Sequence, residues 1–379
     1  MKRVDFLVLI MIGLLLSIKV TTLSSAGTSL TIKATETSKL DVSFASQAIS
    51  IFSLVFYNNT IAFVVCDPNT GEMVILNSFP NIESVSAFVA AVDPEHHRYF
   101  QPVTDNSSTN RLLIIHTLTG EMLAAPPFST TLSSLQYDLK SDYLYGTAYD
   151  FGLMSNVLIK VDPSTLEQTT IITFPEVDGI LAGVSALDIE HDHYFFVGGV
   201  DGKYQIYEVN IQTGVTTTVP ISYPNYIINH FEFDPSDGAL ISVGWFPSVD
   251  GQQLNQQLVR INVETGEIKA IANLPEIKAL YQAASLFDPI ENLYIFPVID
   301  LNDIQRLFIF DVDTGELVAK PELVVVSGDS SFSSLSLQAS SLFFTGQFKS
   351  FEMDRAFRVY LPLVMNCLGS ESTAPETGK

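Results

Sequence analysis

The length, composition and charge of this chain limit the kinds of protein it can be. It has 379 residues, of which 47% are hydrophobic, and its 19 basic and 42 acidic side chains give a net charge of -23. Such a chain repels phosphate backbones and anionic lipid, which argues against nucleic acid as a partner and favours a cationic one.

The first 26 residues have the composition of a secretory signal peptide. Lys2 and Arg3 precede an apolar run at residues 6–18, and the small residues that follow allow cleavage after Ala26. The alternative is an uncleaved anchor, for which the apolar run is short. Cleavage removes three of the 19 basic and one of the 42 acidic residues, which leaves a net charge of -25. We therefore expect a secreted or extracellular protein, or a periplasmic one in a bacterium.

Turns with the sequence TG recur in phase along the rest of the chain. Their spacings are 49, 94, 52 and 49 residues, and the glycines are Gly71, Gly120, Gly214, Gly266 and Gly315. The double spacing contains "VDPSTLEQ", in which Leu166 stands where the missing glycine is expected. The sequence is therefore a repeat with a period near 49 residues.

A second marker, an aspartate that ends an apolar run, keeps the same phase. It lies 26 to 28 residues before the TG position, or 32 in the fifth unit, at Asp93, Asp138, Asp188, Asp234 and Asp288. Each unit then reads as a strand, an Asp turn, a strand, a variable loop, a strand, a TG turn and a strand. Four short antiparallel strands in 40–50 residues are typical of one blade of a β-propeller.

The period predicts an all-β, seven-bladed propeller over residues 27–368, followed by a disordered polar tail at 369–379. The seventh blade is expected to take its strands from "SLSLQ", "SLFFTG" and "FRVYLPLV". It lacks a fourth strand, whereas "SLTIKA" at residues 29–34 is spare at the other end of the chain. We expect this N-terminal strand to complete the last blade and close the ring, which leaves no unpaired edge.

The segments "RLFIFDVDTGELVAKP" and "QLVRINVETGEIKAI" resemble the YVTN/quinoprotein-like (WD-repeat-like) superfamily of β-propellers, and the resemblance implies a fold. Quinoprotein dehydrogenases of that shape carry a tryptophan in blade after blade, whereas this chain has only Trp245. "DVDTGE", with Asp311 and Asp313, resembles the start of a calcium loop, but its relatives "HTLTGE" and "NIQTGV" lack those carboxylates. We interpret it as a turn and expect no cofactor, with Ca²⁺ as the alternative.

The variable loops of a propeller are the B–C and D–A connections, when strands are lettered from the axis outwards, and we expect the functional site there. Strand B ends in an aspartate in five units, at Asp105, Asp150, Asp201, Asp250 and Asp300. One interpretation is a ring of carboxylates that attracts cations or basic side chains. The other is that each aspartate begins a tight turn by accepting hydrogen bonds from its own backbone.

Three further residues are candidates for binding. Trp245 and Phe246 lie in the longest B–C connection and would anchor a protein or carbohydrate partner if exposed, or close the core if buried. His230 opens strand A of the fifth unit, near the axis, and is the best single candidate to face the central channel.

Two kinds of covalent modification are also predicted. Asn58 and Asn106 stand in N-x-S/T sequons, which are glycan acceptors in a eukaryotic secreted protein. Cys66 and Cys367, the two cysteines, fall in units that adjoin where the ring closes, so a disulfide between them is possible.

The sequence favours a binding or scaffold module for a protein or glycan partner. It has no nucleophile elbow, zinc motif or phosphate-binding loop, so no catalytic or metal-ligating residue is predicted. The alternative is a propeller enzyme, a hydrolase or lyase assisted by a divalent metal, with its site at the axial channel.

Overall fold

The structure is a computed structural model that describes residues 49–58, 60–86, 89–219, 226–247, 254–280, 285–326 and 345–348. All of them belong to one compact unit, Phe44–Lys379. The regular structure of these residues consists of strands that form six sheets. None of their elements is a helix long and apolar enough to span a membrane.

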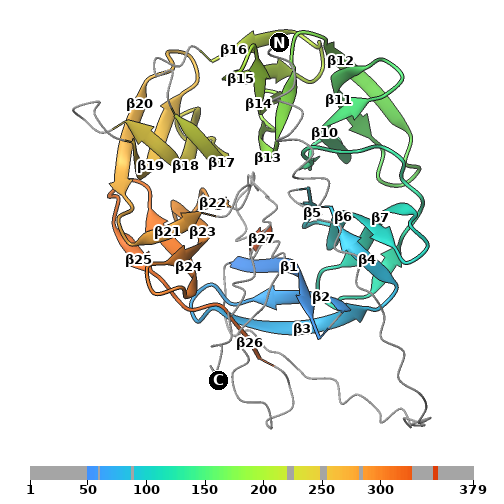
Figure 1. The fold of residues 1–379 in the computed structure, drawn as a ribbon, viewed down its shortest axis with the longest axis horizontal. Coiled ribbons are helices and arrows are strands. Elements are labelled where there is room, and N and C mark those ends of the chain that lie inside the picture. The colour runs from blue at the N-terminus through green and yellow to red at the C-terminus, as the bar shows by residue number, and fades with distance from the viewer. Residues whose placement is uncertain are drawn as a thin grey trace, which may run out of the picture. The chain divides into compact units, whose positions relative to one another are not determined.

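Five sheets are blades made from consecutive segments of the chain (Figure 1). Blade 2 contains β4 (Ile82–Val85), β5 (Ala91–Asp93), β6 (Arg98–Asp105), β7 (Asn110–His116) and β8 (Met122–Ala124). Blade 3 contains β9 (Gln136–Asp138), β10 (Tyr143–Asp150), β11 (Ser155–Val161) and β12 (Gln168–Phe174). Blade 4 contains β13 (Gly179–Asp188), β14 (His193–Val200), β15 (Lys203–Asn210) and β16 (Thr216–Thr218). Blade 5 contains β17 (Ile227–Asp234), β18 (Ala239–Pro247), β19 (Leu254–Asn262) and β20 (Ile268–Asn273). Blade 6 contains β21 (Ile277–Leu280), β22 (Leu286–Asp288), β23 (Leu293–Asp300), β24 (Gln305–Asp311) and β25 (Leu317–Ala319).

Blade 1 combines segments from distant parts of the chain. Its strands are β1 (Ile49–Tyr57), β2 (Thr60–Cys66), β3 (Glu72–Phe79), β26 (Val324–Val326) and β27 (Thr345–Phe348). The last of these pairs antiparallel with the inner edge of β1, with Ile51 opposite Gly346. β26 pairs parallel with the outer edge, with Val324 opposite Glu72. Both edges of blade 1 are therefore covered by strands that follow blade 6 in sequence.

The six blades form a closed circuit. Their innermost strands contact one another in the order β27, β5, β9, β13, β17, β22 and again β27. Buried apolar clusters fill all six spaces between neighbouring blades. The closing cluster packs Val64 and Cys66 of blade 1 against Leu307 and Ile309 of blade 6. Since blade 1 directly follows blade 6, the ring has no space for another blade.

The prediction of seven blades is therefore wrong. Residues 345 and 346, expected in strand B of a seventh blade, belong instead to the strand that completes blade 1. Dividing the chain length by the period could not separate a new blade from strands that complete an existing one. As expected, a strand from one end of the chain completes the blade formed by the other end. That strand is β27, which completes blade 1, and not a strand near the N-terminus that completes the last blade. The expected closing strand at residues 29–34 and its partner at 357–364 lie outside the described residues.

Both sequence markers have a structural cause. The five aspartates that end the inner strands are buried, and each accepts a hydrogen bond from the backbone N–H two residues later. All five TG glycines have φ between 68° and 74°, which glycine adopts without strain. Leu166, at the position of the missing glycine, has a φ of 60° and keeps the same turn. The "DVDTGE" segment is also such a turn, with the Gly315 N–H donating to Asp311 O at 2.9 Å.

The TG glycines also allow close contact between blades. A Cβ added to Gly71 would overlap the carbonyl oxygen of Glu322, which lies after blade 6, and one on Gly315 would overlap the carbonyl oxygen of Ile271 in blade 5. At Gly214 the nearest atom, Ile171 O, would be 3.5 Å away, an ordinary contact. The C–D turn of one blade therefore rests on the outer strand or following segment of the blade before it.

This difference predicts unequal effects of two alanine substitutions. Gly71→Ala and Gly214→Ala both place alanine at positive φ, which costs about 1 kcal/mol. Gly71→Ala also overlaps Glu322, so its free energy of unfolding should fall by about 1–3 kcal/mol more than that of Gly214→Ala. Urea denaturation of both variants measures the difference. Equal losses would contradict the close contact at the closure of the ring.

Candidate functional site

The end of the ring that carries the B–C turns and D–A connections, here called the B–C end, holds the aspartates singled out in the sequence. Asp150 Oδ1 accepts hydrogen bonds from the backbone N–H groups of Gly152 and Leu153, at 2.8 and 3.0 Å. Asp201 and Gly202 have φ values of 50° and 75°, as in the two-residue turns that Asp-Gly favours. These contacts support the interpretation of the aspartates as turn formers. Asp250 lies outside the described residues.

Asp105 and Asp300 are in addition paired with arginines. Asp105 Oδ2 lies 2.5 Å from Arg111 Nε, and Asp300 Oδ2 lies 2.7 Å from Arg306 Nε. Hydrogen bonds from the Ser107 hydroxyl and from Arg111 hold the pKa of Asp105 well below its usual range. Because an arginine of the same hairpin balances each charge, these two carboxylates are poorly placed to hold an external cation.

An apolar groove opens at the B–C end between blades 4 and 5. Its volume is about 280 Å³, and it is lined by Leu181, Val197, Tyr204, Tyr226, Ile227, Ile228 and Asn229. Tyr204 lies at the start of β15 and Ile227 at the start of β17, where they are 52% and 55% exposed. The groove therefore presents exposed aromatic and aliphatic side chains and has no charged residue among these lining residues.

The two aromatic residues predicted from the long B–C connection have different environments. Trp245 is 37% exposed and lies opposite Ile227 in the β17–β18 pairing, so it stands beside the groove. Phe246 is 1% exposed and stacks on Tyr226 with the ring centroids 6.5 Å apart. Successive residues of a strand point to opposite faces, so only Trp245 can be an exposed anchor. Of the two alternatives that the sequence left open, exposure thus holds for Trp245 and burial for Phe246.

Asn229 provides a polar group in this groove. The pairing of β17 with β18 shifts between Ile228 and His230, which makes Asn229 the extra residue of a β-bulge. A bulge redirects a side chain that regular pairing would point elsewhere. Asn229 Oδ1 is buried and has no hydrogen-bond partner among the described residues. Asn229 is therefore the polar residue that lines the groove, with its amide oxygen buried beneath the surface.

His230 is buried between blades 5 and 6 and does not line an open channel. It is 2% exposed, and its Nδ1 lies 2.8 Å from the hydroxyl oxygen of Tyr294. Burial lowers the pKa of His230 to about 3. Glu232, two residues along β17, is 0% exposed, and burial raises the pKa of its carboxyl well above the usual value. Both side chains are therefore uncharged at neutral pH.

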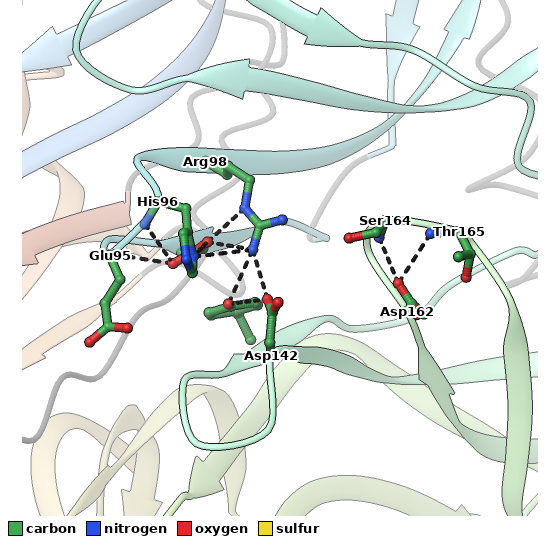
Figure 2. Close-up of polar contacts among 9 residues, drawn as sticks. Glu95, His96, Arg98, Asp142, Asp162, Ser164 and Thr165 are labelled. Atoms are coloured by element: carbon green, nitrogen blue, oxygen red, sulfur yellow. Dashed lines mark hydrogen bonds and ion pairs between the residues drawn. The ribbon is translucent and has the colours of Figure 1, made fainter.

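The opposite end of the ring carries a charged network that joins blades 2 and 3 (Figure 2). The Arg98 guanidinium lies 2.6 Å from Asp93 Oδ2 and 2.7 Å from Asp142 Oδ1. It also donates to the Tyr137 hydroxyl at 3.2 Å. Asp93, His96 and Asp142 form one group whose donor atoms lie within 4.8 Å of one another, the spacing of a metal site. Because Arg98 already balances both carboxylates, we interpret the network as a structural link between blades.

The predicted modification sites lie in contrasting environments. Asn58 and Asn106 are exposed at B–C turns, where a glycan could be attached. Cys66 is 1% exposed in the closing apolar cluster, and burial raises the pKa of its thiol. Cys367 lies outside the described residues, so the disulfide stays a prediction, as does glycosylation.

The sequence analysis missed Tyr204, Tyr226 and Asn229. Tyr204 stands in a β-strand sequence that differs little from those of other blades, and Tyr226 directly precedes β17. The position of Asn229 depends on a one-residue shift in strand pairing, which leaves no local sequence signal. The groove exists because four strands of two blades meet there, and this could be seen only after the ring was built.

Comparisons with known proteins show the β-propeller fold. Residues 125–285 match a family described as a repeat of unknown function (DUF6923). A chain in the crystal structure of a nidogen/laminin complex is 9% identical with a TM-score of 0.52, over 72% of this chain and 93% of that one.

Two further structures are similar at lower scores. A putative TolB from Agrobacterium tumefaciens is 13% identical, over 75% of this chain and 94% of its own, with a TM-score of 0.46. Hydrazine synthase from Kuenenia stuttgartiensis is 12% identical, over 77% and 92%, with a TM-score of 0.48. No curated protein matches the chain. The β-propeller fold that the resemblance implied is thus confirmed by the similarity to the chain in the nidogen/laminin complex.

The lowered pKa of His230 predicts a specific sensitivity to acid. Below its ordinary pKa of 6.5 this histidine binds a proton in the unfolded chain but not in the folded one, until the pH nears 3. Stability from this group is therefore complete above pH 6.5 and falls by about 1.4 kcal/mol for each pH unit below it. In urea unfolding from pH 7 to pH 4, the free energy of unfolding of the wild type should therefore fall relative to that of His230→Gln, which lacks this group and keeps every other titrating residue.

His191→Gln is the matched control. A hydrogen bond that His191 donates to the Asp188 carboxylate raises the pKa of this exposed histidine, so it favours folding at low pH and its loss should steepen the acid dependence slightly. If the unfolding profiles of His230→Gln and the wild type have the same pH dependence, the claim that His230 stays neutral in the folded protein is refuted.

Proposed function

We propose that this chain is a secreted binding or scaffold module that holds a protein or glycan partner at the B–C end of a six-bladed ring. The observation that carries the proposal is the uncharged groove between blades 4 and 5, with Tyr204 and Trp245 exposed at its side and Asn229 within it. Aromatic side chains that are exposed on a rigid scaffold commonly supply most of the energy of binding.

The chemistry of the groove favours an uncharged ligand with one apolar face. The chain carries a net charge of -23, yet its groove is lined by no charged residue among those described. A neutral sugar unit fits, because its C–H face can lie on Tyr204 or Trp245 while its hydroxyl groups face the polar side chain of Asn229. An apolar side chain of a protein partner would fill the same space without satisfying Asn229.

Two sequence features support an exported protein. The leader-like residues 1–26 are those of a secretory signal, and the sequons at Asn58 and Asn106 place acceptors on exposed turns. The crystal structure of a nidogen/laminin complex contains a chain of similar fold. Export to the extracellular space or the periplasm is thus part of the proposal.

The structure favours this function over an enzyme at the axial channel. His230 and Glu232, the ionisable side chains near the axis in blade 5, are 2% and 0% exposed. A substrate would have to separate blades 5 and 6 to reach them. The groove, by contrast, is open to solvent at residues that are half exposed.

The proposal predicts that aromatic residues beside the groove matter for binding and not for folding. Tyr204→Ala and Trp245→Ala should each weaken binding by about 2 kcal/mol, roughly thirty-fold, because each removes an exposed anchor. Thermal unfolding should be nearly unchanged. Binding is measured on an array of neutral glycans and by pull-down from the secreted proteins of the source, with purified wild type and variants.

Phe151→Ala provides the control. Phe151 is 71% exposed in the B–C turn of blade 3, at the same end of the ring but away from the groove. The Phe151→Ala variant should bind the ligand as well as the wild type does. Full binding by both groove variants, or an equal loss in Phe151→Ala, would refute the groove as the site.

A further inference from the structure

Two junctions of the ring place polar side chains at the same four positions of the repeat. Between blades 3 and 4, the Ser134 hydroxyl lies 2.7 Å from the Tyr194 hydroxyl. Two residues later, at the start of β9, Gln136 Nε2 donates to Ser185 O and Ser185 Oγ, at 3.0 and 3.2 Å. Blade 3 thus reaches blade 4 through one side chain of its inner strand and one just before it.

The junction of blades 5 and 6 repeats this arrangement with two ionisable replacements. His230 Nδ1 lies 2.8 Å from the Tyr294 hydroxyl, and the Ser285 hydroxyl donates to Glu232 Oε1 at 2.6 Å. His230 and Glu232 stand four and two residues before Asp234, as Ser134 and Gln136 stand before Asp138. Ser285 and Tyr294 likewise occupy the positions of Ser185 and Tyr194. The same chain therefore contains a neutral and an ionisable version of one junction.

The ionisable version is incompletely hydrogen-bonded. His230 Nε2 and Glu232 Oε2 are buried and have no hydrogen-bond partner among the residues that the structure describes. None of the four residues of the neutral version has such an atom among the buried unpaired groups of the described chain. A buried polar group without a partner is costly, and an ionised one is more costly still.

We propose that the junction of blades 5 and 6 is a proton-binding site, where protonated Glu232 holds the blades together and ionised Glu232 loosens them. The carboxyl has one described donor, Ser285, and that single hydrogen bond is too little to offset the burial of a full negative charge. A protonated carboxyl resembles the Gln136 amide, which the equivalent junction accommodates with its hydrogen bonds made.

The groups that surround Glu232 do not supply a counter-charge. His230 on the same strand is neutral because burial lowers its pKa to about 3. Tyr294 of blade 6 keeps its proton, because burial raises its pKa well above the ordinary value. On the neighbouring β18, Ser242 donates to the carbonyl oxygen of His230. No described lysine or arginine forms an ion pair with Glu232.

The ends of the two inner strands carry further negative charge. Asp234 Oδ2 lies 3.1 Å from Arg260 Nη2, so its charge is largely balanced. Asp288 has an unpaired Oδ2, and burial raises its pKa. Neither residue can stabilise an ionised Glu232, so nothing in these elements opposes the effect of burial.

The direction of the pH effect follows from the proton balance. An unfolded glutamate has a pKa of 4.5, and the folded carboxyl holds its proton to higher pH. Its contribution to stability is complete below pH 4.5 and is lost as the pH rises through the folded pKa. Above pH 6.5 the folded His230 is neutral and the unfolded one loses its remaining proton, so its effect on stability can only rise with pH, and a fall over this range is assigned to Glu232.

Glu232→Gln, which installs the residue of the equivalent junction, tests the proposal. Hydrogen exchange of the full chain is measured at pH 6.5 and 8.5, with rates corrected for intrinsic pH dependence. In the wild type, protection of β17, β22 and β23 should fall by up to about tenfold per pH unit, while β9 and β13 stay protected. In Glu232→Gln the protection of all five strands should be equal at both pH values.

Glu264→Gln, which removes an exposed carboxylate from the C–D turn of the same blade, is the control and should behave as the wild type. A wild-type junction that keeps its protection at pH 8.5 would overturn the proposal. So would the same loss of protection in Glu232→Gln. Because glutamine already fits the equivalent place in blade 3, we expect the variant to fold.

Discussion

The rest of this structure depends on the contact between the outer part of one blade and the C–D turn of the next. At Gly71 and Gly315 the backbone of the preceding blade comes so close that a Cβ would overlap a carbonyl oxygen. That contact requires a glycine for two reasons, the positive φ and the lack of a side chain. It recurs between Gly71 and Glu322, where the first blade meets the segment after the sixth, and so fixes the ring at six blades.

The closed ring gives each junction between blades a definite character. The junction of blades 4 and 5 leaves an apolar groove at the B–C end, where Asn229 is turned inwards by a bulge. Polar side chains join blades 3 and 4 and blades 5 and 6 near the axis, and the second pair is ionisable. A repeat of similar blades thus obtains distinct sites by changing one or two residues at a junction, while the apolar clusters keep the ring rigid.

The sequence was sufficient to predict what repeats. The TG turns and the aspartates that end inner strands mark the blades because each forms the same tight turn in successive blades. Leu166 keeps the turn even without glycine. The sequence could not predict the number of blades, since residues 345–348 complete an existing sheet and carry no mark of that pairing. The burial of Phe246 was left open and Asn229 was missed because strand register, set by the whole sheet, decides which way each side chain points.

The most direct test is whether an engineered disulfide forms between blade 1 and the strand that follows blade 6. Glu72 of β3 lies opposite Val324 of β26, the strand that follows blade 6. Glu72→Cys and Val324→Cys together, oxidised and mapped by mass spectrometry, should give a specific link between residues 72 and 324 in a monomer. Failure of this pair to link, while a pair across β1 and β2 at Phe56 and Ile61 does, would contradict the six-bladed ring.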